Sequence, residues 1–385
     1  MKSAIPYIEI SLNNLLHNLA ALRSRLLKGA DADILAVVKD NAYGCGSRVI
    51  AETLEQKGGV NFYAVCSPRE AFFLRKNGLK SPILVLGPAT KTELKKGNGN
   101  GIVFTLNDIA DIDLWRSAGV PVRFHCNIDT RMHRMGILPS ELAAMASALA
   151  HTDNLLLEGV FTHLANADEP GTATVGEQLR LFNEALSLLK ERGITPRHVH
   201  YANSASIMRS ADLAGATLAR PGIALYGCKP DPKQSFPLDI RPVVSLKSRI
   251  VKMKKVPART PVSYGGRYVT ACETVIATIA LGYGHGLPRS LGNRGDVLIR
   301  GKRYRIAGTV TMDYIMVDTG PVPSVRVGDE VVAMGSQKNE RISPDDVAAL
   351  DNTIGYEILC NLSQSLDRVY LLDGINIARE KGKIF

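Results

Sequence analysis

Short apolar segments rich in Val, Ile and Leu alternate with helix-like segments over roughly the first 230 residues of the chain. Nearly continuous apolar strands separated by helices are typical of a parallel sheet that is covered on both faces. Eight strand–helix units in about 200 residues correspond to the size of a (β/α)8 barrel. The pattern therefore predicts an α/β fold, a TIM-like barrel, with strands at residues 33–39, 62–67, 82–87, 101–106, 122–129, 157–165, 198–202 and 216–227.

Helical spacing is clearest near the start of the chain and in its middle. Leucines recur on one face of residues 12–27, and residues 141–149 are rich in Ala and Leu, so we expect helices in both places. A short strand at residues 7–10 precedes the first helix and is additional to the barrel. A doubly wound open sheet is the main alternative, but no G-x-G-x-x-G motif follows the first strand.

The pattern changes after Gly227. Residues 229–242, KPDPKQSFPLDIRP, contain four prolines and are typical of a linker. The segments beyond it are mostly of β type, with one helix expected near IGYEILCNLS. We therefore predict two domains, a barrel at residues 11–235 and a mostly β C-terminal domain at 236–385, which the N-terminal strand at residues 1–10 joins.

The composition narrows the possible functions. With 385 residues, of which 45% are hydrophobic and 22% charged, the chain is typical of a soluble globular protein with a sizeable core. The six cysteines form no C-x-x-C motif, so no metal site is expected. The net charge of +10 is spread along the chain, which disfavours nucleic-acid binding. Neither a signal peptide nor a membrane-spanning segment is visible, so we expect a cytoplasmic protein.

Polar residues follow several of the predicted strands at their carboxyl ends, where barrel enzymes have their active sites. Taken singly, each has a structural explanation, because a lysine that ends a strand is often only solvated and a lone histidine is often a structural hydrogen-bonding group. Their convergence on one rim favours an active site. The residues concerned are Lys39, Asp129, Arg134, His163, Asn203, Ser204 and Arg220.

The sequence motifs that contain these residues resemble the motif series of the alanine racemases. AVVKDNAYGCG, IDTRMHRMG, FTHLANADE, HYANSAS and LARPGIALYG occur in this order, followed by SYGGRY, GTVTMDYIMVD and IGYEILCNLS. The resemblance extends from about Tyr7 to Arg368. It implies a barrel that binds pyridoxal 5'-phosphate, an amino acid substrate, and a homodimer in which the partner's second domain completes each active site. It also implies that the product is D-alanine for peptidoglycan.

The resemblance assigns two catalytic bases. Lys39 would carry the cofactor and exchange a proton on one face of the substrate, and Tyr264 of the other subunit would act on the opposite face. Both groups normally have a pKa of about 10, so each must be tuned towards neutrality. His163 would bind Tyr264, and Arg220 would face the pyridine nitrogen of the cofactor. Since a guanidinium does not give up its proton, that nitrogen would stay unprotonated.

The remaining roles concern binding. Arg134 resembles the arginine that contacts the phenolic oxygen of the cofactor and the substrate carboxylate, and Met312 of the partner would help to bind this carboxylate. The phosphate would be held by the hydroxyl groups of three residues and by two backbone N–H groups. These residues are Tyr43, Ser204 and Tyr356 for the hydroxyls, and Gly222 and Ile223 for the backbone.

Several residues of this chain differ from the family pattern. These differences put the range of substrates in doubt more than they put the type of reaction in doubt. Asn127 stands where many members have a lysine, often carbamylated, that braces the arginine matching Arg134. Asp40, Cys45 and His285 also replace more usual residues. A racemase of broader specificity, acting on serine or lysine, is the nearest alternative. A decarboxylase of the same barrel family and a non-catalytic pyridoxal-phosphate carrier are further alternatives, although carriers lack the second domain.

Overall fold

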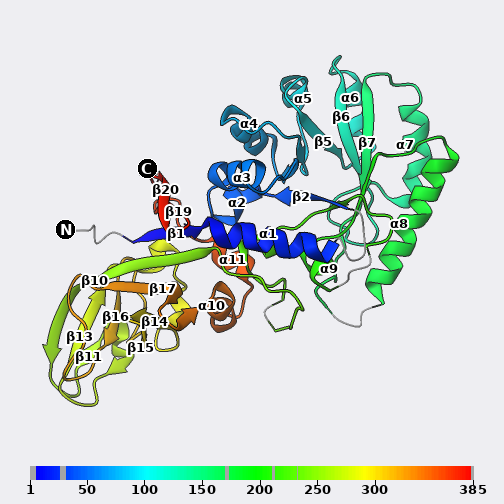
Figure 1. Cartoon of the computed structure of the whole chain (residues 1–385). Helices are drawn as coiled ribbons and strands as arrows, with labels where there is room; N and C mark the ends of the chain where they lie inside the picture. Colours follow the sequence, from blue (N-terminus) through cyan, green and yellow to red (C-terminus); the bar gives the residue numbers. More distant parts are fainter. Residues whose placement is uncertain (1–5, 27–31, 170–172, 210–212, 232, 383–385) are drawn as a thin grey trace.

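The chain forms two adjoining bodies, a helix-covered barrel and a β-rich body, which lie at opposite ends of the molecule (Figure 1). The computed structural model describes residues 6–26, 32–169, 173–209, 213–231 and 233–382. No helix in these parts of the chain is long and apolar enough to cross a membrane.

The barrel contains eight parallel strands in the order β8-β7-β6-β5-β4-β3-β2-β9. Backbone hydrogen bonds between the segments of the two end strands close the sheet, from Thr217 N, just before β9, to Val199 O (2.8 Å) and from Arg220 N, just after β9, to Ala202 O (2.8 Å). Each predicted segment contains or overlaps one strand, so the barrel prediction is confirmed and the open sheet is excluded. The strands are β2(Asp33–Val37), β3(Phe62–Val65), β4(Ile83–Val85), β5(Ile102–Leu106), β6(Val122–Asn127), β7(Leu155–Phe161), β8(His198–His200) and β9(Leu218–Ala219).

Helices cover the outside of the barrel (Figure 1). The leucine-rich segment forms the first helix, and its leucines are buried as the spacing predicts, except Leu16, which is partly buried. The helices of this body are α1(Leu12–Leu26), α2(Lys39–Tyr43), α3(Ser47–Gln56), α4(Pro68–Lys76), α5(Lys91–Gly97), α6(Asp111–Arg116), α7(Leu142–Leu149), α8(Thr174–Glu191) and α9(Ser204–Arg209).

The eighth strand is much shorter than the sequence suggests. The expected strand at 216–227 is regular only over β9, after which the chain forms the 3-10 helix η2(Ile223–Tyr226). Pro221 has no N–H to extend a sheet, and the Tyr226 hydroxyl donates a hydrogen bond to Val37 O (2.9 Å). The apolar run is therefore buried as a turn that packs against the barrel, not as a strand.

The second body is built mostly of antiparallel strands in the order β15-β14-β17-β10-β1-β19-β20, with β13 beside β10 and β16, and β18 beside β17. The N-terminal strand lies inside this sheet, since it pairs with β10 and β19. The elements are β1(Tyr7–Ser11), β10(Val244–Val256), β11(Pro261–Val262), β12(Tyr268–Val269), β13(Thr274–Ile279), β14(Asp296–Ile299), β15(Lys302–Arg305), β16(Ile315–Asp318), β17(Glu330–Gln337), β18(Glu340–Ile342), α10(Pro344–Asp351), α11(Gly355–Cys360), β19(Asp367–Leu372) and β20(Ile375–Glu380).

A buried amide fastens the proline-rich linker to the first helix. Asn18 is 0% exposed, and its side-chain N–H groups donate to Leu225 O (2.9 Å) and Arg241 O (2.8 Å). Its oxygen accepts from Arg241 N (2.7 Å). Because a buried amide without partners would be costly, this network holds the linker in place between the two bodies.

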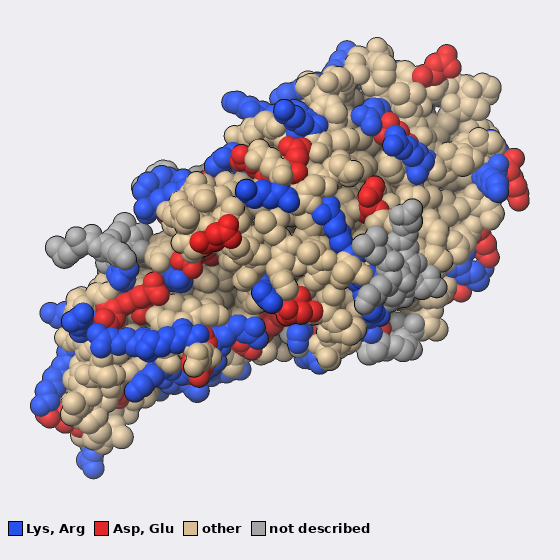
Figure 2. All heavy atoms as spheres, in the orientation of Figure 1, with Lys and Arg blue, Asp and Glu red and all other residues tan. Residues whose placement is uncertain are grey.

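Lysines and arginines are spread over both bodies, with a row along β10 (Figure 2).

Candidate active site

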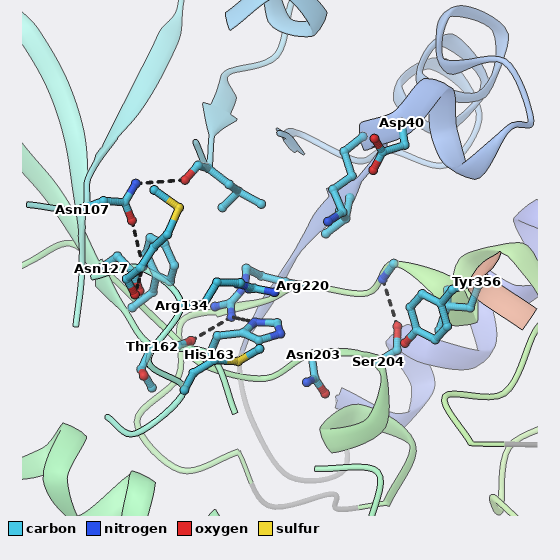
Figure 3. Close-up of a pocket in the computed structure, with 18 of the residues that line it drawn as sticks. Asp40, Asn107, Asn127, Arg134, Thr162, His163, Asn203, Ser204, Arg220 and Tyr356 are labelled. Atoms are coloured by element: carbon cyan, nitrogen blue, oxygen red, sulfur yellow. Dashed lines mark hydrogen bonds between the residues drawn. The ribbon is translucent and has the colours of Figure 1, made fainter. Parts of the chain in front are cut away.

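A cavity of about 430 Å³ opens at the carboxyl ends of the barrel strands (Figure 3). Nine of the eleven residues that the sequence assigned to the site line this cavity. Eight of them follow five different barrel strands, as the rule for barrel enzymes leads one to expect, and Tyr356 lies in α11. These nine are Lys39, Tyr43, Arg134, His163, Ser204, Arg220, Gly222, Ile223 and Tyr356.

Lys39 begins an unusual turn. The four residues that follow it, Asp40 to Tyr43, all have φ between 52° and 55°, in the left-handed helical region. This conformation costs an L-residue about 1–2 kcal/mol. The turn buries the Tyr43 ring against the ring of Tyr226, with centroids 4.8 Å apart. The backbone is therefore strained directly after Lys39, the residue that the sequence predicts to be catalytic.

One end of the cavity is lined by hydroxyl groups and backbone donors. Ser204 Oγ accepts hydrogen bonds from Gly222 N (2.9 Å) and Ala224 N (3.3 Å). The Ile223 N–H has no hydrogen-bond partner among the described residues. Burial raises the pKa of the Tyr43 and Tyr356 phenols, so both remain O–H donors at neutral pH. Directed donors of this kind suit an oxyanion such as a phosphate.

Arg220 connects the cavity to a buried chain of histidines. Its Nη1 lies 2.7 Å from His200 Nδ1, and its Nη2 donates to Thr162 O (2.8 Å) and lies 3.3 Å from His163 Nδ1. His200 Nε2 in turn lies 2.8 Å from His125 Nδ1. Because a guanidinium only donates, both Nδ1 atoms that face Arg220 must accept. The histidines therefore carry their protons on Nε2.

The charge states follow from burial. Burial and the neighbouring Arg134 lower the pKa of Arg220 to about 9, so this residue is still a cation at neutral pH. Burial, together with Arg220, Arg134 and Lys39, lowers the pKa of His163 to about 3. His163 is therefore neutral at pH 7 and presents one N–H donor, at Nε2. The third nitrogen of Arg220, Nε, has no hydrogen-bond partner among the described residues.

Arg134 has no acidic partner in the part of the chain that the structure describes. The two amide hydrogens of Asn127 go to Asn107 Oδ1 (2.9 Å) and Met135 O (3.0 Å) (Figure 3). The nearby carboxylate of Asp129 accepts from backbone N–H groups of its own loop. The guanidinium of Arg134 therefore remains available to an anion that enters the cavity. Asn127 is uncharged and cannot provide this anion itself.

Tyr264 and Met312 do not line this cavity. They lie on the second body, where their side chains are 75% and 56% exposed. Hydrogen bonds join their segments, since Thr309 Oγ1 donates to Tyr264 O (2.9 Å) and Gly284 N donates to Met312 O (2.9 Å). Tyr283 and Tyr314, in the segments beside them, are also exposed. Exposed apolar side chains that gather in this way commonly mark an interface.

Some polar groups of the site were not predicted from the sequence. Asn107 follows β5 directly, so the rule that polar residues end the strands could have found it. His125 and His200 stand inside apolar runs and are 0% exposed. A histidine inside a buried strand is itself a signal, because it must find a hydrogen-bond partner within the core.

Comparison with known proteins identifies the family. Residues 10–230 match the alanine racemase N-terminal domain, and residues 243–370 match the alanine racemase C-terminal domain. The chain is 39% identical to the alanine racemase of Citrifermentans bemidjiense over 386 residues, which covers 96% of this chain and all of that protein.

Solved structures agree with this result. The alanine racemase of Bacillus anthracis with bound L-Ala-P superposes with a TM-score of 0.90 at 34% identity, covering 99% of this chain and 98% of that one. A histidine racemase from Leuconostoc mesenteroides subsp. sake has a TM-score of 0.87 at 24% identity over 97% of this chain and 99% of that one, a likeness that shows the fold alone. The chain therefore belongs to the alanine racemase family, whose members are isomerases acting on amino acids.

Proposed function

We propose that the protein interconverts L-alanine and D-alanine with pyridoxal 5'-phosphate, using Lys39 on one face of the substrate and Tyr264 of a partner subunit on the other. The observation that carries the proposal is the cavity itself. It combines a lysine at the start of a strained turn, an arginine that has no acidic partner among the described residues, and a neutral histidine held by a second arginine. Tyr264, which we propose as the second base that racemisation needs, lies exposed on the other body.

The residues of the cavity fit the cofactor. The hydroxyls of Tyr43, Ser204 and Tyr356 suit its phosphate, as does the Ile223 N–H, which has no partner in the described parts of the chain. The Gly222 N–H, also expected at the phosphate, donates to Ser204 Oγ and so orients that hydroxyl. Three cations and two carboxylates line the cavity, which favours an anionic ligand. When bound, pyridoxal phosphate withdraws electrons from the substrate α-carbon and makes its hydrogen acidic.

Arg220 favours racemisation over other chemistry of this cofactor. Arg220 is a buried cation whose Nε carries a hydrogen, so a ring nitrogen that faces it must accept that hydrogen and stay unprotonated. An unprotonated ring is a weaker electron sink, which disfavours side reactions such as transamination. Arg220 also holds His163 with its proton on Nε2, and this N–H would donate to the oxygen of the partner subunit's Tyr264.

Substrate binding and assembly follow from the same arrangement. Arg134 would bind the substrate carboxylate as a charged donor. Tyr264 and Met312 are exposed and do not line the cavity of their own chain, so we propose a homodimer in which the exposed face around these residues covers the partner's cavity. We propose further that the enzyme acts in the cytoplasm and supplies D-alanine for peptidoglycan.

The first experiment is chiral chromatography of the products from L-alanine, L-serine and L-lysine, with pyridoxal phosphate present. The proposal expects D-alanine to form fastest. D-serine or D-lysine as the main product would keep the mechanism and change the specificity. Binding of the cofactor without inversion of any substrate would refute the proposal in favour of a decarboxylase or a carrier.

Two variants test the assignment of the bases. Lys39→Ala is expected to lose both the visible absorbance of the bound cofactor and the activity. Tyr264→Phe is expected to keep the cofactor and lose racemisation. When the two variants are mixed, hybrid dimers should contain one intact site and regain activity. A mixture that stays inactive although mass spectrometry detects the hybrid would contradict the shared site.

A further inference from the structure

The left-handed turn after Lys39 receives support from outside its own backbone. Within the turn, Ala42 N donates to Val38 O and Gly44 N donates to Asp40 O, both at 3.0 Å. The Asp40 N–H, next to Lys39, takes no part in this pattern as a donor. Its acceptor among the described residues is the carboxylate of Glu70, at 2.6 Å.

Glu70 belongs to a different strand–helix unit of the barrel. Its Oε2 accepts from Cys66 N and Ser67 N, both at 2.9 Å, and forms the capping box of α4 with Ser67. Its Oε1 is left to accept from Asp40 N. One carboxylate thus joins the end of β3, the start of α4 and the residue that follows Lys39.

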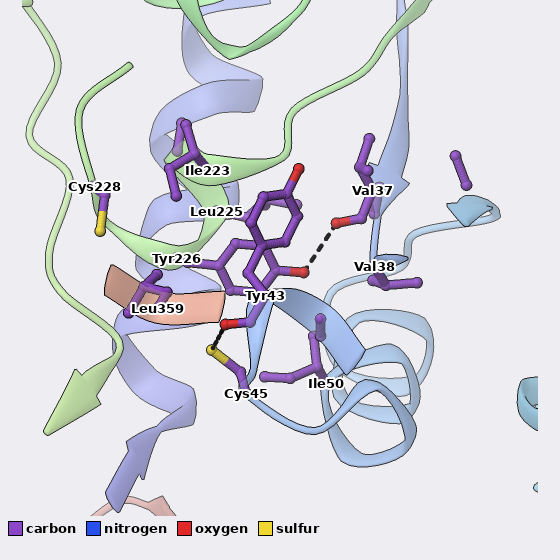
Figure 4. Close-up of a cluster of buried hydrophobic side chains, with 14 of the residues drawn as sticks. Val37, Val38, Tyr43, Cys45, Ile50, Ile223, Leu225, Tyr226, Cys228 and Leu359 are labelled. Carbon is purple, nitrogen blue, oxygen red and sulfur yellow. Dashed lines mark hydrogen bonds between the residues drawn. The ribbon is translucent and has the colours of Figure 1, made fainter. Parts of the chain in front are cut away.

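The far side of the turn is fixed as well. Arg368 of β19, which is 4% exposed, donates from Nε to Gly44 O (2.7 Å). Figure 4 shows the ring of Tyr43, the last residue of the turn, packed against the ring of Tyr226, with Cys45 close by. Packing and Arg368 hold the carboxyl-terminal end of the turn. At its amino-terminal end, Val38 N donates to Ala64 O (2.9 Å), and Glu70 binds the N–H of the first left-handed residue, Asp40.

We propose that Glu70 is a positioning residue for Lys39. By accepting from Asp40 N–H, its carboxylate stabilises the left-handed conformation and so sets the direction in which the Lys39 side chain leaves the backbone. The inference rests on the proposed function, in which Lys39 carries the cofactor and exchanges the substrate proton. A lysine held in this way loses less conformational freedom when the cofactor binds and stays aligned with the α-carbon during the reaction.

Glu70→Gln tests the contact. The glutamine side chain has one acceptor oxygen, which three donors of the capping box, the Ser67 hydroxyl among them, compete to bind. Its amide nitrogen then faces Asp40 N–H, so that two donors oppose each other. The cap of α4 is kept in part, and the support of the turn is lost.

Glu93→Gln is a matched control. Glu93 forms the same capping box at the start of α5, where its Oε2 accepts from Thr90 N and Thr90 Oγ1, both at 2.8 Å. No contact between Glu93 and the turn after Lys39 is present among the described residues. Ser67→Ala is a second control, because it weakens the cap of α4 and leaves both oxygens of Glu70 in place.

The measurements are the dissociation constant of pyridoxal phosphate, the kcat and KM for L-alanine, and the melting temperature of the apo-protein. We expect Glu70→Gln to raise the cofactor dissociation constant and to lower kcat by about tenfold each, with KM changed much less. The two controls should lower the melting temperature to a similar degree and leave both constants near the parent values. Glu70→Asp, which keeps the charge on a shorter side chain, should fall between the parent and Glu70→Gln.

Two outcomes overturn different conclusions. If borohydride reduction and mass spectrometry find no cofactor on Lys39 of the parent protein, the proposed function fails. If Lys39 of the parent is labelled and Glu70→Gln matches Glu93→Gln in cofactor affinity and kcat, Glu70 is only a helix cap and the inference is wrong.

Discussion

Acidification is expected to destabilise this protein between pH 7 and pH 5, because the barrel buries two neutral histidines. His125 and His200 are both 0% exposed and hydrogen-bonded to each other. Burial, with His198 and Arg220 nearby, lowers the pKa of His125 to about 3. Burial, with Arg220 and His125, holds the pKa of His200 well below its ordinary value.

The sign follows from proton binding. Both pKa values in the folded protein lie below the value of about 6.5 in the unfolded chain, so the unfolded chain binds more protons as the pH falls. Stability is therefore full above pH 6.5 and is lost below it. For one histidine that stays neutral when folded, the change from pH 7 to pH 5 costs about 2 kcal/mol. The pair costs about 4 kcal/mol, a large part of the 5–15 kcal/mol by which domains are usually stable.

Urea unfolding of the apo-protein at pH 7, 6 and 5 measures this loss, with the fluorescence of Trp115 as the signal. His125→Asn keeps an acceptor near the position of Nδ1 and cannot titrate, so its loss of stability between pH 7 and 5 should be smaller by about 2 kcal/mol. His151→Asn, at an exposed position, is the control. If His125→Asn loses as much stability as the parent over this range, the buried histidine does not exclude a proton and the reasoning is refuted.

Three further substitutions probe the packing around the site. Gly222→Ala would place a Cβ 2.4 Å from the Tyr43 hydroxyl, so we expect the cofactor dissociation constant to rise at least about tenfold in an absorbance titration. Gly227→Ala, at φ 77° and with a Cβ 1.9 Å from Arg241 O, should lower the free energy of unfolding by more than about 2 kcal/mol in urea. Trp115→Phe, in a site that is 1% exposed, should cost about 1–3 kcal/mol in calorimetry or circular dichroism. If a variant keeps the parent's cofactor dissociation constant or free energy of unfolding, its site is packed less tightly than the structure indicates.

The strand count and the position of Lys39 could be predicted because both depend on local pattern. Parallel strands that are buried on both faces need runs of apolar residues, and the residues that end them share one rim of the barrel. The same reasoning overestimated β9, because Pro221 and Gly222 end the strand while the apolar residues beyond them remain buried in η2.

Long-range contacts could not be predicted in this way. The bond from Asp40 N to Glu70 joins residues 30 positions apart, and Glu70 looks in the sequence like an ordinary helix-capping residue. The protonation of His163 depends on Arg220, which lies 57 positions later and reaches it only when β9 closes the barrel. Neither dependence leaves a local pattern in the chain.

The sequence by itself determined the α/β barrel, the mostly β second body and the lysine at the end of the first barrel strand. Periodic burial and strand-end chemistry are properties of neighbouring residues. Only the tertiary structure decided which groups share the cavity, which histidine nitrogens carry protons, and that Tyr264 lies exposed on the other body. These features depend on distances between distant segments and on the exclusion of water, which exist only once the chain has folded.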